Sequence, residues 1–336
     1  MTVSDVPLLS VRDLNVEFDV QGGTSRVINR LGFDLGHGET MAIVGESGCG
    51  KSMTALAIMG LVPDPPGRIA GGEIRLLGED LVKAGEERLM QIRGNSVSMV
   101  FQEPMTSLNP VFTVGEQIAE TVRQHTGASR RDARDRAIEM LEMVGIPAAR
   151  QRVDDHPHQM SGGMRQRVMI AIALACEPKL LIADEPTTAL DVTIQAQIFD
   201  LFQTLQQRMG TAIILITHDI GVVAQMAQRV MVMYAGHKVE EGPVQTVLGQ
   251  AGHPYTQGLI ACVPHLRADV TDEPTDLFEI PGVVPGVAEL NNPGCPFVAR
   301  CVQAIDRCVI EQPALTPVNG SHCAACWLLP DSEATT

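Results

Sequence analysis

The clearest chemistry in this sequence belongs to one glycine-rich stretch, Gly45-Glu46-Ser47-Gly48-Cys49-Gly50-Lys51-Ser52. It follows an apolar run at residues 41–44 and precedes a segment with helical periodicity, the context that a G-x-x-x-x-G-K-[ST] phosphate loop requires. Its glycines lack the Cβ atoms that would keep phosphate oxygens away from backbone N–H groups. Lys51 offers a charge to the β- and γ-phosphates, and Ser52 offers a hydroxyl to Mg²⁺. We therefore expect a nucleoside triphosphate site rather than a plain turn, with every residue of the stretch except Glu46 contributing to it.

Two adjacent carboxylates, Asp184 and Glu185, follow a second apolar run at residues 180–183. In a protein with a phosphate-binding loop, the first acid is expected to hold Mg²⁺ through water and the second to polarise the attacking water. Many strands end in Asp or Glu, so the pair alone is a weak signal. Its place after the loop and before the segment 186–191 favours the catalytic interpretation.

Two further polar residues follow strand-like segments. Gln102 comes directly after residues 97–101, and His218 comes shortly after residues 211–216. Because nucleotide-binding sheets present their ligands at the carboxyl ends of strands, we expect Gln102 near Mg²⁺ or the attacking water and His218 at the γ-phosphate. A solvated loop glutamine and a structural histidine are the alternatives.

A second glycine pair occurs in Ser161-Gly162-Gly163, at the start of an apolar helix. Ser161 is a good helix N-cap, and a capped helix with a flexible entry is the simpler interpretation. Two adjacent glycines are more than a cap needs, and they would leave bare N–H groups at the positive end of the helix. The stretch therefore predicts a second phosphate-binding site that has no lysine of its own.

Phe18 ends a strand-like segment upstream of the phosphate loop. An aromatic ring at this place could stack on an adenine base, and a core phenylalanine is the alternative. Aromatic residues make up only 3% of the chain, so few others compete for the role.

The composition limits the class of protein. With 336 residues the chain is long enough for two domains, and its formal net charge of −15 argues against a chain that wraps nucleic acid. Charged residues interrupt the first twenty positions, so no secretory leader is expected. The longest apolar run, residues 168–176, is far shorter than the roughly 20 residues that cross a bilayer. Any membrane association is expected to go through a partner.

The hydrophobic periodicity predicts the elements that position these residues. Short strands are expected at residues 8–11, 14–18 and 27–33, as a small antiparallel layer ahead of the nucleotide core. From about residue 103 to 165 the helical period dominates, which indicates an inserted helical subdomain. We expect the nucleotide-binding domain to span residues 1–250 and a Pro- and Gly-rich extension to span residues 251–336.

Five of the eight cysteines fall after residue 290, within the extension. Free buried cysteines, a structural zinc site and an iron–sulfur cluster are three interpretations of their spacing. Zinc sites favour pairs of C-x2-C, and only one such pair occurs here, whereas a cluster tolerates irregular spacing in a loop-rich segment. The five residues are Cys295, Cys301, Cys308, Cys323 and Cys326.

Taken together, these motifs resemble the complete set of an ABC-type ATPase, in its order and spacing, over about residues 8–250. The resemblance also covers Asp191, which follows the paired carboxylates and is expected to contact nucleotide. Three segments resemble the dipeptide/oligopeptide importer branch of this family, at residues 102–110, 253–256 and 280–285. The resemblance implies an α/β fold, with a RecA-like P-loop core, the antiparallel layer, the helical subdomain and the cysteine-bearing extension.

The resemblance also implies partners. In this family the phosphate loop of one subunit and the Ser-Gly-Gly stretch of a second enclose each ATP, and we expect a heterodimer with a related ATPase subunit. Two membrane permeases would hold this pair at the cytoplasmic face of the membrane, and an extracytoplasmic binding protein would deliver the peptide. Met160 and Met164 depart from the Leu and Gln that usually flank the Ser-Gly-Gly core.

In the resembling importers, three spaced cysteines precede a fourth that lies beside an aromatic residue or a histidine. On this pattern the expected ligands of a [4Fe–4S] cluster are Cys295, Cys301, Cys308 and Cys326, with zinc as the alternative and Cys323 as a spare. A nickel or glutathione importer is an alternative cargo class for the same ATPase. A soluble ABC ATPase that acts on nucleic acid or ribosomes, and a P-loop kinase or ligase, are the alternatives of a different kind.

Overall fold

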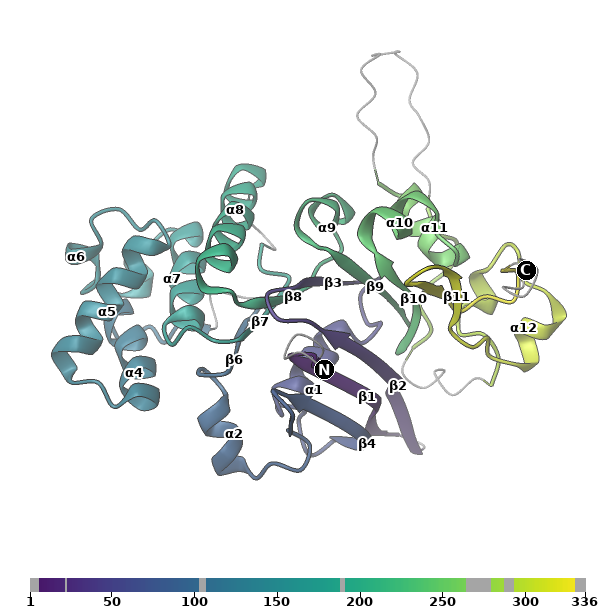
Figure 1. The fold of residues 1–336 in the computed structure, drawn as a ribbon, viewed down its shortest axis with the longest axis horizontal. Helices are drawn as coiled ribbons and strands as arrows, with labels where there is room; N and C mark the ends of the chain where they lie inside the picture. The colour runs from purple at the N-terminus through teal and green to yellow at the C-terminus, as the bar shows by residue number, and fades with distance from the viewer. Residues whose placement is uncertain are drawn as a thin grey trace, which may run out of the picture.

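The computed structural model describes residues 6–21, 23–102, 107–187, 191–263, 279–286 and 293–329. A large central sheet is accompanied by a small antiparallel sheet, by a group of helices and by the C-terminal extension (Figure 1). The helices α4 to α7 lie at one end of the molecule, and the extension with α12 lies at the other. This architecture agrees with the α/β fold that the sequence predicts.

The central sheet positions the predicted site. Strands β9, β3, β8, β7 and β6 run parallel, and every residue of β3, β7 and β8 is buried. The eight strands, in their order across the sheet, are β11 (Thr316–Asn319), β12 (His322–Ala324), β10 (His237–Pro243), β9 (Arg229–Tyr234), β3 (Thr40–Val44), β8 (Ala212–Ile216), β7 (Leu180–Asp184) and β6 (Val97–Val100).

Three hydrophobic clusters cover the two faces of this sheet in the described part of the chain. Alternate residues of one strand enter different cores, so that Leu181 packs with helices α7 and α8 whereas Ile182 packs with α1 and the antiparallel sheet. A strand buried on both faces needs apolar side chains at every position, which is why these segments are continuous apolar runs in the sequence. The helices are α1 (Lys51–Ile58), α7 (Gly162–Leu174) and α8 (Val192–Met209).

The antiparallel sheet differs in detail from the prediction. Residues 9–20 form one long strand, β1 (Leu9–Val20), not two short ones, and it pairs with β2 (Gly23–Leu35) and β4 (Gly67–Leu76). The strand is not broken at Arg12-Asp13 but is bulged there, with Asp13 at a φ of 45°. A bulge keeps the pairing while it bends the strand, so polar residues at this point are no sign of a strand end. The fourth strand is β5 (Glu79–Asp80).

The segment after Gln102 forms a group of helices, as its helical periodicity predicts. Each main helix begins at a residue whose hydroxyl accepts a backbone N–H of the first turn: Thr113 for α4, Ser129 for α5 and Ser161 for α7. Helix α7 runs past the predicted end of the subdomain, because its apolar part also packs on the central sheet. The elements are α4 (Val114–Thr126), α5 (Arg130–Met143), α6 (Ala149–Arg152) and the 3₁₀ turn Pro157–Gln159.

Shorter helices complete the described parts of the chain. They are α2 (Glu86–Ile92), α9 (Ile220–Met226), α10 (Val244–Gly249), α11 (Pro254–Ala261), the 3₁₀ turn Val298–Arg300 and α12 (Asp306–Ile310). In the described ranges, no helix combines the length and the apolar character that crossing a membrane requires.

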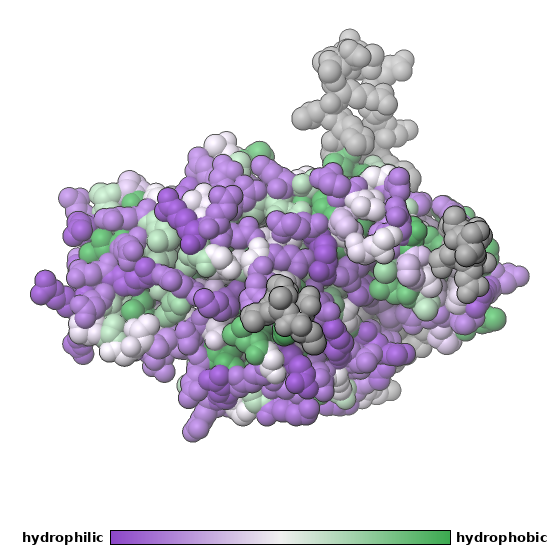
Figure 2. All heavy atoms as spheres, in the orientation of Figure 1, coloured by the Kyte–Doolittle hydropathy of each residue, from purple (hydrophilic) through white to green (hydrophobic). Residues whose placement is uncertain are grey.

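The C-terminal extension is joined to the nucleotide core. Strand β12 pairs with β10, so the extension lengthens the central sheet. Phe297 packs against Tyr234 of β9 and Tyr255 of α11, with ring centroids 5.1 and 5.3 Å apart. Figure 2 shows a largely hydrophilic face on which hydrophobic side chains also gather over the extension. The boundary at residue 250 stays a prediction, and the two parts share a sheet and a hydrophobic cluster.

Candidate nucleotide-binding site

The carboxyl ends of the parallel strands bring the predicted residues to one pocket of about 500 Å³. The phosphate loop follows β3, Gln102 follows β6, Glu185 follows β7 and His218 follows β8. The pocket is lined by Val27, Ser47, Gly48, Gly50, Lys51, Ser52, Met53, Gln102, Glu185 and His218. Val27 reaches the pocket from β2 of the antiparallel sheet, and no local pattern around it predicts this role.

The backbone of the loop explains two of its glycines. Gly45 has a φ of 154°, and a Cβ there would lie 2.3 Å from the Met233 carbonyl oxygen and 2.7 Å from the Cys49 sulfur. Gly50, at a φ of 104°, directly precedes α1, whose N-terminal N–H groups favour anions. Gly45 is therefore required by packing against β9, in addition to any approach of phosphate.

Lys51 is nearly buried and its ammonium group donates to the carbonyl oxygens of Gly45 and Glu46, at 2.7 and 3.0 Å. The loop therefore surrounds its own lysine and holds the charge beside the pocket. A phosphate entering the pocket would meet an ammonium group that is already oriented by the backbone.

The hydroxyl of Ser52, which lines the pocket, donates to the carboxylate of Asp184 at 3.1 Å, and Asp184 itself does not line the pocket. Burial raises the pKa of the Asp184 carboxyl above its ordinary value, and the hydrogen bond from Ser52 opposes this shift. A bound cation would favour the ionised carboxylate. Hydroxyl and carboxylate oxygens are the ligands that Mg²⁺ prefers, so this pair fits the predicted magnesium site, with Gln102 lining the same pocket.

Glu185 contacts both other predicted catalytic residues. Its carboxylate accepts a hydrogen bond from the Gln102 amide at 3.2 Å and lies 3.5 Å from Nδ1 of His218. Its backbone has a φ of 43°, an uncommon conformation for a residue with a side chain, and its N–H donates to Ile216. Three strand ends thus converge on one carboxylate, the one that the sequence predicts to polarise the attacking water.

The structure does not bring every predicted nucleotide contact to this pocket. Among the described residues, the predicted ones that do not line it are Phe18, Gly45, Cys49, Ser161, Gly162, Gly163, Asp184 and Asp191. Asp191 accepts the Ile194 N–H and caps α8, as Ser161 caps α7, and a Cβ on Gly162 would meet no atom within 4 Å. The ring of Phe18 packs over Gly67 in the antiparallel sheet. Their nucleotide contacts stay predictions.

Residues that the sequence did not single out hold the loop from behind. The N–H of Glu46 donates to the Tyr255 hydroxyl at 2.8 Å, and the Glu46 carboxylate forms an ion pair with Arg300 of the extension at 2.7 Å. Burial raises the pKa of the Tyr255 hydroxyl, which stays neutral at physiological pH. Tyr255 belongs to one of the family-like segments, but its sequence gave no sign of this partner.

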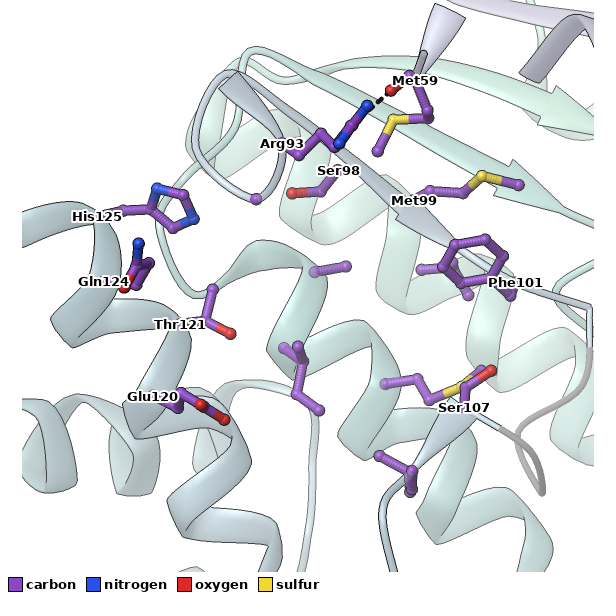
Figure 3. A pocket seen from close by; sticks show the side chains of 16 residues that line it. Met59, Arg93, Ser98, Met99, Phe101, Ser107, Glu120, Thr121, Gln124 and His125 are labelled. Carbon is purple, nitrogen blue, oxygen red and sulfur yellow. Dashed lines mark hydrogen bonds between the residues drawn. The ribbon is translucent and has the colours of Figure 1, made fainter. Parts of the chain in front are cut away.

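A second pocket, of about 470 Å³, lies between the central core and the inserted helices (Figure 3). Thr121, Gln124 and His125 of α4 lie across the hollow from Met99 and Phe101 at the end of β6. Phe101 directly precedes Gln102 and is 40% exposed, which is unusual for a phenylalanine beside a sheet. Phe101 lines this groove and the next residue, Gln102, lines the nucleotide pocket, so the two are neighbours along the chain.

Four of the five tail cysteines gather around a third, small cavity. Cys295, Cys301, Cys308 and Cys326 line it together with Trp327, whereas Cys323 does not line it in the described part of the chain. Burial raises the pKa of the Cys295 thiol to about 11. No group of three or more His, Cys, Asp or Glu side chains is arranged to hold a metal ion in the described ranges.

Comparison with known proteins decides the family. Residues 28–188 match the ABC transporter family, and residues 239–308 match the oligopeptide/dipeptide transporter C-terminal region. The chain belongs to the ABC transporter family. This ABC ATPase is 50% identical to a probable peptide ABC transporter ATP-binding protein of Sinorhizobium fredii over 95% of its own length and 94% of the relative's.

Two relatives from Bacillus subtilis support the same assignment. The ABC ATPase is 47% identical to the dipeptide transport ATP-binding protein DppD over 96% of this chain and 94% of the relative, and 50% identical to the oligopeptide transport ATP-binding protein OppD over 97% and 90%. Among solved structures, the dimeric bacterial ABC transporter cassette MJ0796 aligns with a TM-score of 0.63 at 28% identity, covering 70% of this chain and 98% of the cassette.

Proposed function

We propose that this ABC ATPase hydrolyses ATP to drive import of dipeptides or oligopeptides through a membrane permease. The contact of Glu185 with both Gln102 and His218, directly beside the phosphate loop, supports hydrolysis. The peptide cargo rests on the matched C-terminal region and on the names of the relatives. A nickel or glutathione cargo is the alternative for the same chemistry.

Each residue has a separate task in this proposal. Lys51 and the loop N–H groups bind the phosphates, while Ser52, Asp184 and Gln102 would hold Mg²⁺, which neutralises phosphate charge when bound. Glu185 accepts a proton from the attacking water, and His218 contacts the γ-phosphate. Gln102 touches Glu185 and follows Phe101, so a movement at the groove would change the position of a catalytic contact.

A second subunit completes the ATP site in this proposal. Ser161 to Gly163 and Asp191 do not line the pocket of their own chain, and Gly162 has open space beside it, as a site that receives phosphate from a facing subunit requires. MJ0796 is described as dimeric. We propose a related but different ATPase subunit as the partner, which would make the active form a heterodimer.

The groove beside Gln102 is the proposed contact with the permeases. Its lining combines apolar side chains of β6 and α7 with polar side chains of α4, which suits a short amphipathic helix. Two permease subunits would hold the ATPase pair at the cytoplasmic face of the membrane, and an extracytoplasmic binding protein would contact only the permeases. The net charge of −15 supports a protein rather than a nucleic acid partner.

The test of this function uses the complete transporter in vesicles. Wild-type complex is expected to take up a labelled dipeptide only with ATP, whereas Glu185→Gln should bind ATP and lower turnover by about 100-fold or more. Normal turnover in Glu185→Gln would remove the residue from its assigned role. Uptake of Ni²⁺ or glutathione without peptide uptake would replace the cargo and leave the ATPase assignment intact.

We also propose that Cys295, Cys301, Cys308 and Cys326 hold a [4Fe–4S] cluster. The observation in favour is that these four thiols line one cavity and Cys323 does not. Sulfur atoms around a single tetrahedral zinc lie only about 3.8 Å apart, given Zn–S bonds of about 2.3 Å, whereas a cluster accepts more widely spaced thiolates. The group would stabilise a segment that has little apolar bulk of its own.

Anaerobically purified protein tests this proposal. Visible absorbance with iron and sulfide in equal amounts is expected, and Cys308→Ser or Cys326→Ser should abolish it while the matched variant Cys323→Ser keeps it. Stoichiometric zinc without iron would contradict the cluster. Loss of iron in Cys323→Ser but not in Cys326→Ser would change the proposed fourth ligand.

A further inference from the structure

Arg300 links the extension to the phosphate loop. The residue lies in the 3₁₀ turn Val298–Arg300, directly before Cys301, and its side chain is only 4% exposed. Both terminal nitrogens of its guanidinium group meet the Glu46 carboxylate, with Nη1–Oε2 at 2.7 Å and Nη2–Oε1 at 3.0 Å. Such a two-pronged pair fixes the direction of both side chains as well as their distance.

The remaining surface of the guanidinium group is also occupied. Nε donates to the Pro281 carbonyl at 2.8 Å, and Nη2 reaches the Ile280 carbonyl at 3.3 Å. On another side the group lies beside the rings of Tyr234 and Phe297, 5.7 and 6.0 Å from their centroids. Arg300 therefore has one position, which the extension and the core define together.

Glu46 transmits this position to the lysine of the loop. Its side chain is held by Arg300, its N–H is held by the Tyr255 hydroxyl, and its carbonyl oxygen accepts a hydrogen bond from the Lys51 ammonium. The residue itself does not line the nucleotide pocket in the described part of the chain, whereas its neighbour Ser47 does. A shift of Glu46 would therefore move Ser47 and also the carbonyl oxygen that accepts a hydrogen bond from Lys51. It would leave the position of Glu185 unchanged.

We propose that Arg300 is a positioning residue for the phosphate loop, which makes ATP affinity depend on the folded C-terminal extension. A loop that is held in its binding conformation loses less freedom when the phosphates arrive, so it binds them more tightly. The catalytic contacts of Glu185 come from other strands and do not depend on this ion pair. The inference rests on ATP binding at the phosphate loop, and it does not depend on what the cysteines bind.

The experiment measures binding of a fluorescent ATP analogue, and the KM and kcat for ATP, in the full chain assembled with its transporter. Arg300→Gln is expected to raise Kd and KM about tenfold and to leave kcat at saturating ATP within about twofold. Glu46→Gln should raise Kd and KM to a similar extent. Because both changes remove the same ion pair, the Kd of the double variant should not exceed the higher Kd of the two single variants. Arg300→Lys keeps the charge but loses the fork, so it should fall between wild type and Arg300→Gln.

Glu311→Gln serves as the matched control, because it breaks the exposed ion pair with Arg307 in the same extension and has no contact with the loop. It should leave Kd unchanged. Lys51→Ala gives the Kd of a phosphate loop that has lost its lysine. If wild type bound the ATP analogue no more tightly than Lys51→Ala, ATP binding at this loop would itself be refuted. Should Arg300→Gln not fold, Glu46→Gln decides the question. A Kd within twofold of wild type in Glu46→Gln, or a loss of kcat with unchanged KM, would overturn the proposal.

Discussion

The contact between β10 and β12 allows one prediction to be worked out in full. Glu240 and His322 are 0% and 1% exposed, and Nε2 of the ring lies 2.6 Å from the carboxylate. Glu240 also accepts the N–H groups of Gly252 and His253. Nδ1 of His322 has no hydrogen-bond partner among the described residues, so the contact of Nε2 with Glu240 is the polar contact that holds the ring there.

Replacing this histidine by alanine should loosen the extension. His322→Ala removes one of three donors from a buried carboxylate, which costs about 1.5 to 3 kcal/mol, and adds a cavity. We expect a total loss of about 3 kcal/mol in the free energy of unfolding. At about 2.1 cal/mol/K of unfolding entropy per residue, a chain of 336 residues would show a fall in Tm of roughly 4 °C.

Calorimetry of the purified full chain measures the change, and limited proteolysis shows whether the extension is cleaved first. His322→Gln is the matched variant, because its amide can donate from nearly the same place as Nε2, and it should lose less than half as much. If His322→Ala shifted the free energy of unfolding by less than about 0.5 kcal/mol, the reasoning from buried donors to stability would be refuted.

Three further predictions concern the nucleotide site and its surroundings. Gly45→Ala should abolish ATP binding because its Cβ would overlap the Met233 carbonyl oxygen, whereas Gly48→Ala, whose Cβ would meet no protein atom within 4 Å, should weaken binding only through its φ of 80° and its place in the pocket lining; equilibrium binding compares them. Phe18→Leu keeps an apolar side chain in the antiparallel sheet but removes the ring atoms beside Gly67, so a rise in Kd of at least about fivefold would support adenine stacking and an unchanged Kd would favour a core role. Burial lowers the pKa of His237 in the folded chain below its ordinary value of 6.5. As the pH falls below about 6.5, the unfolded chain therefore binds a proton more readily than the folded chain, and the free energy of unfolding decreases. His237→Gln should show a smaller fall in Tm between pH 7.5 and pH 5.5 than wild type, and an equal fall would contradict the assignment.

The nucleotide pocket was accessible to sequence reasoning because its parts are local. A glycine loop, a pair of acids and a residue directly after an apolar strand are each visible within a few positions, and parallel strands bring their carboxyl ends to one edge. This is why Lys51, Gln102, Glu185 and His218 are found around one pocket. The same local reasoning failed at Asp13, because a bulge and a strand end have the same polar signature.

By itself the sequence determined the phosphate loop, the pair of acids after an apolar strand, the family and the presence of a cysteine-rich tail. Only the tertiary structure decided which distant residues meet: Arg300 with Glu46, 254 positions apart, His322 with Glu240, 82 positions apart, and four cysteines without the fifth. The physical reason is that periodicity and turn chemistry act between near neighbours. The partner of a buried charge is instead set by which strand ends and turns pack together, and no local pattern carries that information.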